Sequence, residues 1–236
     1  MKTFQLGTAI NQLGLGKTKF INTNLKEDNT VPDWATGLDL WGLFLPRLTI
    51  IGDSREQDKW IKKVCDHYGI AYEEARKTKD TDNLKEGDYS FKVTFDIGEH
   101  SYVGEVAYER KGSISEFYGN CQSGRTRVKK EFERFGTKQY DKVVLMLQFA
   151  NKLSDLYNLK FSYYGSGGEK IVKETGKTPL TTIMSWKQPN NNNFDILMST
   201  NKVELFWLMI LDMFYYFRQD IRLECISKNL IENVEN

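Results

Sequence analysis

The feature that most constrains the fold is a β-hairpin pattern in the middle of the chain. Tyr89–Phe95 alternates apolar and polar side chains, as a half-buried strand does, and Asp96–His100 supplies a polar turn. Tyr102–Glu109 predicts the returning strand. A turn centred in that polar segment pairs Asp88 with Glu109, give or take a residue, and opposed positions have Cβ atoms roughly 5 Å apart. The pattern therefore predicts two carboxylates side by side at the open end of the hairpin.

The segments before this hairpin predict a strand, a helix and a second strand. Leu48–Ile51 is a short apolar run that delivers Asp53 at its end. Gln57–His67 carries its apolar residues on one face, as an amphipathic helix does, and Gly69 stands just past its end. Ile70–Glu74 predicts the second strand. We expect Asp53 to lie at the same edge of the sheet as the hairpin carboxylates.

The segments after the hairpin complete an α/β pattern. Ser113–Cys121 and Gly124–Phe135 predict helices separated by a glycine turn, and Val143–Phe149 predicts an apolar strand. The order strand, helix, hairpin, helix, strand indicates an α/β domain with a mixed β-sheet core flanked by helices.

The C-terminal part of the chain gives weaker signals. Gly165–Gly168 predicts a flexible loop, and Pro189–Asn193 predicts a polar turn. Lys202–Arg218 predicts a helix that is too apolar to stand alone in water, so it must be buried against the core or against a partner subunit. The second possibility makes a homodimer a prediction of the sequence.

Two parts of the chain differ in pattern and suggest a domain division. Residues 1–46 contain glycines and a polar, turn-rich stretch, and they predict an N-terminal extension laid on the main body. Residues 47–236 predict the main domain. Its motifs lie in 47–150, and 151–236 form a C-terminal part of helices and loops.

Whole-chain composition narrows the class of protein. The formal net charge is +1, from 33 basic and 32 acidic residues, so any binding of nucleic acid must come from local patches. Cys65, Cys121 and Cys225 form no C-x-x-C pair, which argues against a disulfide framework or a zinc site and fits a reducing cytoplasm. Met1–Ile10 lacks the features of a signal peptide, and the apolar run Leu205–Phe217 is too short to span a membrane.

The hairpin carboxylates predict a site for phosphodiester hydrolysis. Such a reaction needs an activated water and neutralisation of the charge on the phosphate, and a divalent metal supplies both. Mg²⁺ keeps several waters, so Asp88 and Glu109, with the backbone carbonyl of Arg110, are sufficient protein ligands. Lys111 lies two residues after Glu109 and therefore projects from the same face of a strand, where its ammonium group can orient the attacking water.

The upstream segment adds further candidates. Asp53 and Glu56 are predicted as additional metal ligands or as partners for Arg55 or Lys111. Arg55 and Arg110 are candidate DNA contacts, because a guanidinium group grips phosphate oxygens in a fork. As single motifs these are usually solvated strand ends and turns. Their occurrence at both ends of one hairpin, with a third acidic motif ending another strand, favours catalysis.

A basic stretch runs along the predicted helix Gly124–Phe135 and just beyond it. Its candidate DNA-binding residues would give salt-dependent binding if they line one face, and they are Arg125, Arg127, Lys129, Lys130, Arg134 and Lys138. A solvated helix face interspersed with Glu131 and Glu133 explains them equally well. Tyr163, Tyr164 and Trp186 could stack on bases, although core packing is the favoured interpretation.

These motifs together resemble a known family. Residues 53–56 (Asp-Ser-Arg-Glu), 87–89 (Gly-Asp-Tyr) and 109–116 (Glu-Arg-Lys-Gly-Ser-Ile-Ser-Glu) are similar to the XPF-type structure-specific endonuclease domain, whose pattern is G-D-x(n)-E-R-K-x(3)-D. The segments 117–120, 124–125 and 131–134 make the chain most like the short members found in phages and prophages.

The resemblance implies a fold, an activity and a set of site residues. It implies a restriction-endonuclease-like fold and a nuclease that cuts branched or flapped DNA with Mg²⁺ or Mn²⁺, in DNA processing, recombination or repair. It implies roles at the metal site for Asp53, Glu56, Asp88, Glu109 and Lys111. A non-catalytic DNA-binding or assembly subunit, as some members of the family are, is the alternative.

The chain departs from the family pattern at two points. The last acid of the pattern falls on Ser115 by strict spacing, and Glu116 is the nearest carboxylate. Residues 161–236 also lack the paired glycine turns of the helix-hairpin-helix modules that follow this domain in cellular relatives. DNA must therefore be held by the nuclease domain itself, by the N-terminal extension or by a partner protein.

Overall fold

A computed structural model of the chain describes residues 44–56, 58–75, 87–94, 101–137, 140–164, 166–186 and 194–227. The strands are β1 (Leu48–Asp53), β2 (Ala71–Ala75), β3 (Tyr89–Thr94), β4 (Ser101–Val103), β5 (Val106–Lys111), β6 (Lys142–Leu147), β7 (Lys160–Tyr164), β8 (Lys170–Glu174) and β9 (Phe194–Met198). The helices are η4 (Leu45–Arg47), α2 (Trp60–Tyr68), α3 (Ile114–Cys121), α4 (Arg125–Thr137), η5 (Leu153–Tyr157), α5 (Thr178–Trp186) and α6 (Lys202–Ser227).

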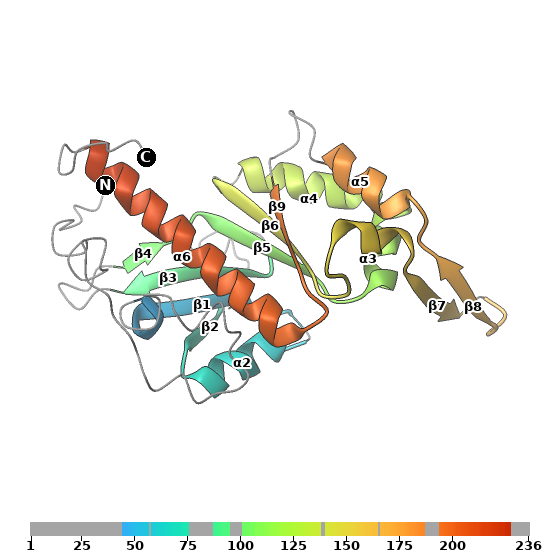
Figure 1. Cartoon of the computed structure of the whole chain (residues 1–236), viewed down its shortest axis with the longest axis horizontal. Coiled ribbons are helices and arrows are strands. Elements are labelled where there is room, and N and C mark those ends of the chain that lie inside the picture. The colour runs from blue at the N-terminus through green and yellow to red at the C-terminus, as the bar shows by residue number, and fades with distance from the viewer. Residues whose placement is uncertain are drawn as a thin grey trace.

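Seven strands form one mixed sheet, in the order β2-β1-β3-β5-β6-β9, with β4 added beside β3 (Figure 1). β3 runs antiparallel to its neighbours β1 and β5, whereas β1–β2, β5–β6 and β6–β9 are parallel pairs. The predicted α/β fold with a mixed β-sheet flanked by helices is confirmed.

The central strands bury both of their faces, because their side chains alternate between two cores. Tyr108 of β5 and Val144 and Met146 of β6 face a core built with α2 and α6. Ala107 and Leu145 face the opposite core, which contains residues of α3, α4 and α5. The sheet is therefore the middle layer, with helices on both sides.

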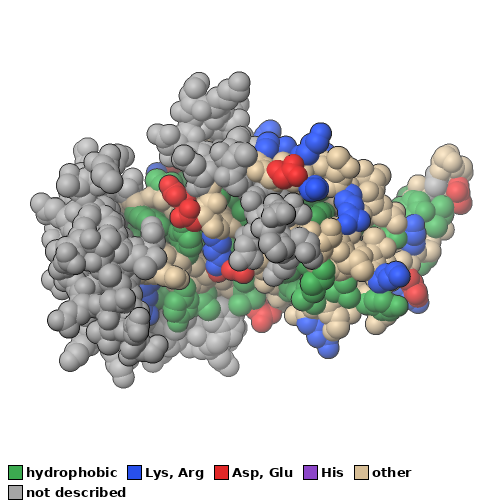
Figure 2. All heavy atoms as spheres, turned by 90° about the horizontal axis from the view of Figure 1, so that it is seen from above, with side chains coloured by type: hydrophobic (Ala, Val, Ile, Leu, Met, Phe, Trp, Pro, Cys, Tyr) green, Lys and Arg blue, Asp and Glu red, His purple; other side chains and the backbone are tan. Residues whose placement is uncertain are grey.

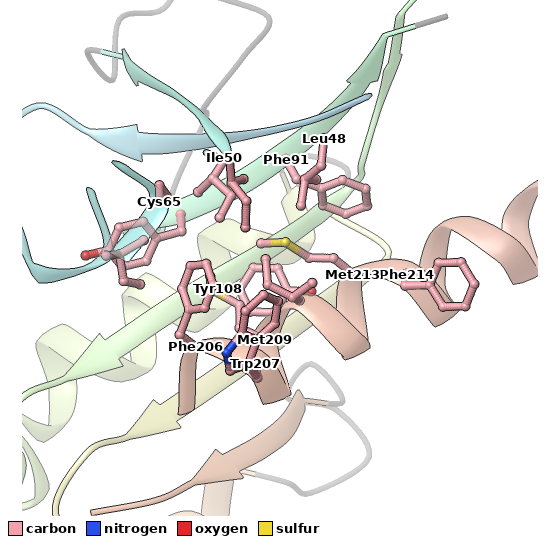
Figure 3. Packing of buried hydrophobic residues seen from close by; sticks show 14 of the residues in the cluster. Leu48, Ile50, Cys65, Phe91, Tyr108, Phe206, Trp207, Met209, Met213 and Phe214 are labelled. Atoms are coloured by element: carbon pink, nitrogen blue, oxygen red, sulfur yellow. The ribbon is translucent and has the colours of Figure 1, made fainter. Parts of the chain in front are cut away.

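The long helix α6 confirms the apolar helix predicted for residues 202–218. Its side chains pack on β1, β3 and β5, as Figure 3 shows for Met213, which extends toward Ile50 and Phe91, and for Met209 beside Tyr108. Asp212, which interrupts the apolar run, accepts hydrogen bonds from the hydroxyl of Tyr108 (2.8 Å) and the ammonium group of Lys142 (2.6 Å). The apolar face of α6 is thus buried within its own chain.

The structure also bears on the expectations for a membrane span and for the cysteines. Among the residues that the structure describes, no helix combines the length and apolar character needed to cross a membrane. Cys65 and Cys121 are buried free thiols. Burial raises the pKa of Cys65 to about 12 and that of Cys121 to about 11, so both remain protonated at neutral pH.

The predicted hairpin is present, but its returning strand is divided. The pairing is Lys92 with Val103 between β3 and β4, and Tyr89 with Tyr108 between β3 and β5, so the register shifts by two residues across Gly104 and Glu105. A side chain on Gly104 would lie 2.4 Å from the ring of Phe91, which makes glycine necessary at this break. Because the shift is two residues, every side chain keeps its face.

Several elements outside the hairpin refine the prediction. Helix α2 begins at Trp60 and not at Gln57, which lies outside the described residues, and Gly69 ends it in the left-handed conformation (φ 68°). The predicted hairpin turn also lies outside the described residues. So does most of the predicted N-terminal extension, although Phe44 and Leu45, before the expected boundary, lie in the core.

The C-terminal part contains elements that the sequence did not predict. The sequence did not predict the antiparallel strands β7 and β8, which flank the loop expected at Gly165–Gly168; residues 166–168 form a turn and Gly165 lies outside the described residues. Strand β9 joins the main sheet beside β6, and α5 packs with the core of α3. Both elements are short, and β9 is paired with a strand some fifty residues earlier, so local periodicity gives little sign of it. The predicted polar turn at 189–193 is outside the described residues.

Candidate active site at the edge of three strands

Three carboxylates lie in a row across adjacent strands. The ladder between β1 and β3, continued by one residue, places Asp88 opposite Asp53. On the other side, the amide of Asp88 donates a hydrogen bond to the carbonyl of Tyr108 (2.8 Å), the residue before Glu109 on β5. The amide of Asp53 donates a hydrogen bond to the carbonyl of Asp88 (2.8 Å), which ties the first two strands together at this point. Since Tyr89 faces the α6 core, all three carboxylates project from the opposite face. The observed pair Tyr89–Tyr108 agrees with the predicted register and brings Asp88 near Glu109, and the direct pairing of Asp88 with Glu109 stays a prediction.

Gly87 fixes the position of Asp88, the middle carboxylate of this row. Its φ of +84° lies in the region that favours glycine. A Cβ atom there would also lie 3.1 Å from the Cβ of Ala107 and 3.2 Å from the carbonyl oxygen of Tyr108. The Gly-Asp sequence therefore has a local structural reason, because Gly87 allows the chain to turn tightly against β5 and present Asp88.

The row opens into a cavity of about 580 Å³. Nine residues line it: Asp53, Arg55, Glu56, Asp58, Asp88, Glu109, Arg110, Lys111 and Glu116. Six are carboxylates and three are cations, so the formal charge of the lining is −3. An excess of negative charge in a partly enclosed space attracts a cation.

Glu109 and Lys111 form a buried ion pair on β5. The Lys111 ammonium group donates to Oε1 of Glu109 at 2.6 Å, and both side chains are less than one tenth exposed. Burial disfavours the charged ammonium, but the adjacent Glu109 carboxylate raises the pKa of Lys111 above its ordinary value. Lys111 is thus a cation at neutral pH. The second oxygen of Glu109, Oε2, is buried and has no hydrogen-bond partner.

Asp88 is held next to this pair in a strained electrostatic setting. Its Oδ2 accepts a hydrogen bond from the backbone amide of Arg110 at 2.7 Å. Burial, followed by repulsion from the Glu109 carboxylate, raises the pKa of Asp88 well above its usual range, despite this hydrogen bond and the charge of Lys111. A bound cation would offset the repulsion that raises the pKa of Asp88.

Arg110 connects two walls of the cavity. Its guanidinium group donates to Glu56 at 2.8 Å and to Gln148 at 3.0 Å, and it lies 3.5 Å from Asp58. The side chain is 8% exposed, so these partners surround most of it. The predicted phosphate contact by Arg110 remains a prediction, and the geometry shows Arg110 holding Glu56 in place.

Asp53 and Arg55 form a separate pair at the rim. The guanidinium group of Arg55 donates to both oxygens of Asp53, at 2.9 to 3.3 Å, and the amide of Arg55 donates to Oδ1 at 3.0 Å. The Asp53 side chain is buried, whereas that of Arg55 is 65% exposed. Arg55 therefore presents a cation to solvent at the rim.

Glu116 occupies the wall contributed by α3. Ser113 caps this helix, accepting a hydrogen bond from the amide of Glu116 (3.2 Å), and Glu116 in turn accepts one from the amide of Gly112 (3.2 Å). Its carboxylate lies 3.8 Å from the ammonium group of Lys111. Ser115 is not among the residues that line the cavity. Of the two positions considered for the last acid of the pattern, only Glu116 faces the cavity, and its role there stays a prediction.

The predicted DNA-binding cations of α4 lie outside the cavity. Arg125, Arg127, Lys129 and Lys130 are all exposed. Arg125 donates to Ser185 (3.0 Å) and Arg127 to Asn120 (2.8 Å), which holds these side chains against the protein. Figure 2, which looks onto α4 and α5, shows Lys and Arg side chains gathered over this part of the surface.

Asp58 and Gln148 were absent from the sequence-based site. Asp58 was hidden inside the predicted helix at 57–67, which in fact begins two residues after it. Gln148 directly follows β6, the strand parallel to β5, and a polar residue at that edge is the signal that could have identified it. Both residues hold Arg110 in place.

The donor set fits a divalent cation bound by two carboxylates. Mg²⁺ accepts one or two protein carboxylates and keeps its remaining waters. Glu109 Oε2 is a buried acceptor without a partner, next to Asp88, whose ionisation is opposed by Glu109. Within the described ranges, no three His, Cys, Asp or Glu side chains converge as a metal cluster. The carboxylate of Asp53 pairs with Arg55, which is one of the two roles predicted for it, and its role as a metal ligand stays a prediction.

Comparisons with known proteins give one kind of similarity. No known family and no curated protein matches the sequence. Among solved structures, XPF from Aeropyrum pernix matches with a TM-score of 0.42 and 15% identity over 70% of this chain and 64% of that chain. XPF from Aeropyrum pernix in complex with DNA matches with a TM-score of 0.43 and 15% identity over 74% of this chain and 66% of that chain. This chain thus spans slightly less than two thirds of the length of these structures.

Proposed function

We propose that this protein is a divalent-metal-dependent DNA endonuclease that hydrolyses phosphodiester bonds in branched or flapped DNA. The observation that carries the proposal is that Asp88 and Glu109 lie near each other in one cavity lined by six carboxylates and three cations, with Lys111 in contact with Glu109. The motif resemblance adds the expected setting, which is DNA processing, recombination or repair in phage or other mobile DNA.

Four residues that line the cavity each have a proposed task. Asp88 and Glu109 would hold Mg²⁺ or Mn²⁺, and a bound ion would polarise the phosphate and supply an activated water. Lys111, a buried cation, would stabilise negative charge that develops on the phosphate and orient the water. It cannot serve as a general base while it remains protonated. Glu116 lies close enough to Lys111 to help fix its position.

The surrounding cations have a second proposed task, which is to hold the DNA backbone. Arg55 is 65% exposed at the rim of the cavity and would contact a phosphate near the bond that is cut. The exposed cations of α4 would bind phosphates farther along the strand and give binding that weakens as salt rises.

A non-catalytic DNA-binding or assembly subunit is the competing function. One observation favours it: Glu109 is already paired with Lys111. Titration with Mn²⁺ separates the two functions, because a catalytic site should bind the ion in the millimolar range or tighter. That binding should be lost in Asp88→Ala.

The decisive test is cleavage of a panel of labelled flaps, forks, four-way junctions, single strands and duplexes with Mg²⁺ or Mn²⁺. Asp88→Ala and Lys111→Ala should each reduce cleavage at least about a hundredfold, since both remove charge at the reacting phosphate. Asp195→Asn is the matched control, because this carboxylate is 61% exposed and lies on β9, outside the cavity. Cleavage that persists in Asp88→Ala and Lys111→Ala overturns the assignment.

The mass of the purified protein in solution tests the predicted homodimer. The buried face of α6 removes one reason for a second subunit, since its apolar residues pack within their own chain. A solution mass near 27.5 kDa would exclude a stable homodimer, and twice that mass would support it.

A further inference from the structure

The hairpin β7–β8 projects from the body of the protein at the end away from α6 (Figure 1). Its two strands form a separate two-stranded sheet. One face carries six exposed side chains: Lys160, Ser162, Tyr164, Lys170, Val172 and Glu174. A two-stranded hairpin is only marginally stable without packing on one face, so the opposite face must anchor it.

The inner face of the hairpin is anchored on α3. The ring of Phe161 packs on that of Tyr118 with centroids 4.9 Å apart, and the ammonium group of Lys173 lies 5.1 Å from the centre of the same ring. Tyr118 is two residues beyond Glu116, which lines the cavity. Since a helix rises about 1.5 Å per residue, the hairpin is fixed within a few helical turns of the carboxylate row.

The outer face combines exposed apolar and basic side chains. Tyr164 is 76% exposed and Val172 is 64% exposed, high values for residues of this size and polarity. Tyr164 is paired directly with Lys170 across the two strands, so an aromatic ring and a cation stand side by side near the tip. Tyr163, on the other face, is 42% exposed. The sequence favoured core packing for these two tyrosines, and the structure shows both at the surface, whereas Trp186 is buried.

Charge on this side of the molecule favours an anionic partner. Residues 125–134 and 160–177 together contain nine Lys and Arg and four Glu, a formal charge of +5, whereas the whole chain carries +1. Both segments adjoin α3, because α3 contacts α4 and β7. An aromatic ring next to a cation, within a basic surface, suits a strand whose bases are unpaired, since bases stack on the ring and phosphates meet the cation.

We propose that the outer face of β7–β8 binds an unpaired DNA strand, with Tyr164 stacking on a base and Lys170 contacting a phosphate. The proposal rests on the proposed nuclease function and narrows its substrate to DNA with a single-stranded segment near the bond that is cut. Stacking is available only to bases that are not enclosed in a duplex. The hairpin therefore distinguishes a flap or fork from plain duplex DNA, without a separate DNA-binding module.

Binding is measured by fluorescence anisotropy of labelled single-stranded, flapped and duplex DNA in EDTA, where cleavage cannot occur. Tyr164→Ala should weaken binding of single-stranded and flapped DNA by about 5- to 150-fold, the range found for removal of one base-stacking ring. Duplex binding should change less than twofold. Tyr164→Phe keeps the ring and should bind like the unaltered protein. Tyr215→Ala, which removes a 48% exposed tyrosine from α6, is the matched control.

Three results would overturn the proposal: equal binding by Tyr164→Ala and the unaltered protein, an equal loss for duplex and single-stranded DNA, or no binding of any DNA. Circular dichroism of each variant shows whether it is folded, and Tyr164→Phe separates the ring from the fold. Failure of the proposed nuclease function can be distinguished from failure of the proposed binding site. A protein that binds single strands through Tyr164 but cuts no DNA with Mg²⁺ or Mn²⁺ refutes the nuclease function and keeps the hairpin as a binding site.

Discussion

Replacement of Asp88 by Asn should make the metal-free protein more stable while abolishing cleavage. Asp88, at the start of β3, lies near Glu109 of the neighbouring strand β5, and repulsion between the two carboxylates contributes to the raised pKa of Asp88. An Asn at this position still offers a carbonyl oxygen to the amide of Arg110, which now donates to Asp88 at 2.7 Å. Its NH₂ group is also a potential donor to the unpartnered oxygen of Glu109. The change thus removes repulsion and keeps the hydrogen bond.

The size of the effect follows from the strand geometry. At a pH above the raised pKa of Asp88, where both carboxylates are ionised, two unit charges roughly 5 to 6 Å apart repel by about 3 kcal/mol at an effective dielectric constant of about 20. The cation of Lys111 offsets part of this repulsion. A net gain of about 1 to 2 kcal/mol in the free energy of unfolding is therefore expected. For a chain of this length, that gain raises Tm by about 2 to 8 °C.

The raised pKa of Asp88 also makes the stability of the metal-free protein depend on pH. Between the ordinary pKa of an Asp and the raised pKa of Asp88, the folded protein holds a proton that the unfolded chain has released. The stability of the metal-free protein should therefore fall as pH rises through that interval. Asp88→Asn has no carboxyl group to titrate there, so its stability should be flatter over the same interval.

The assay is thermal unfolding in EDTA and in Mg²⁺, followed by cleavage of labelled flapped DNA. Bound Mg²⁺ should raise Tm for the unaltered protein and leave that of Asp88→Asn unchanged, because the ion stabilises only a fold that binds it. Asp195→Asn removes an exposed carboxylate outside the cavity and should not raise Tm. A lower Tm for Asp88→Asn than for the unaltered protein in EDTA would refute the electrostatic reasoning, and retained cleavage would refute the role of Asp88.

Three other outcomes follow from the structure. Gly87→Ala should lower the free energy of unfolding by about 1 to 2 kcal/mol or more and impair cleavage, whereas Gly69→Ala, also at positive φ but with no atom within 4 Å of the added carbon, should cost less and leave cleavage unchanged; urea denaturation compares them. Asp212→Ala leaves Tyr108 and Lys142 without a shared acceptor and should cost about 2 to 4 kcal/mol by the same method, more than Asp195→Ala, and an equal cost would contradict a stabilising role. Lys129→Gln with Lys130→Gln should reduce the slope of log affinity for duplex DNA against log salt by roughly 1 to 2, and an unchanged slope would place the DNA elsewhere.

The hairpin shows how far local sequence determines the fold. Alternation in residues 89–95 and 102–109 predicted two antiparallel strands, and the observed register pairs Tyr89 with Tyr108 and so places Asp88 beside Glu109. The sequence did not predict the break at Gly104 and Glu105, because alternation continues across a shift of two residues. Face and partner were therefore predictable, and the local path of the strand was not.

The cavity shows what a linear pattern omits. Asp53, Glu56, Glu109 and Lys111 were predicted from motifs, and the structure brings them to one cavity. Their individual pairings could not be predicted. Arg110 reaches Gln148, which lies thirty-eight positions away, and the carboxylate of Asp53 is directed to Arg55 and not to Asp88. Such choices depend on side-chain packing between strands, which no local period records.

By itself, the sequence determined the mixed α/β core, the apolar helix α6 and the facing carboxylates, because each depends on residues within one or two neighbouring elements. Tertiary structure alone decided three other features: the place of β9 in the sheet, the role of Asp212 as a half-buried acceptor, and the exposure of Tyr164. All three depend on contacts between segments far apart in the chain. An aromatic residue predicts a core position when read alone, and it lies at the surface here because only the opposite face of its hairpin is anchored on α3.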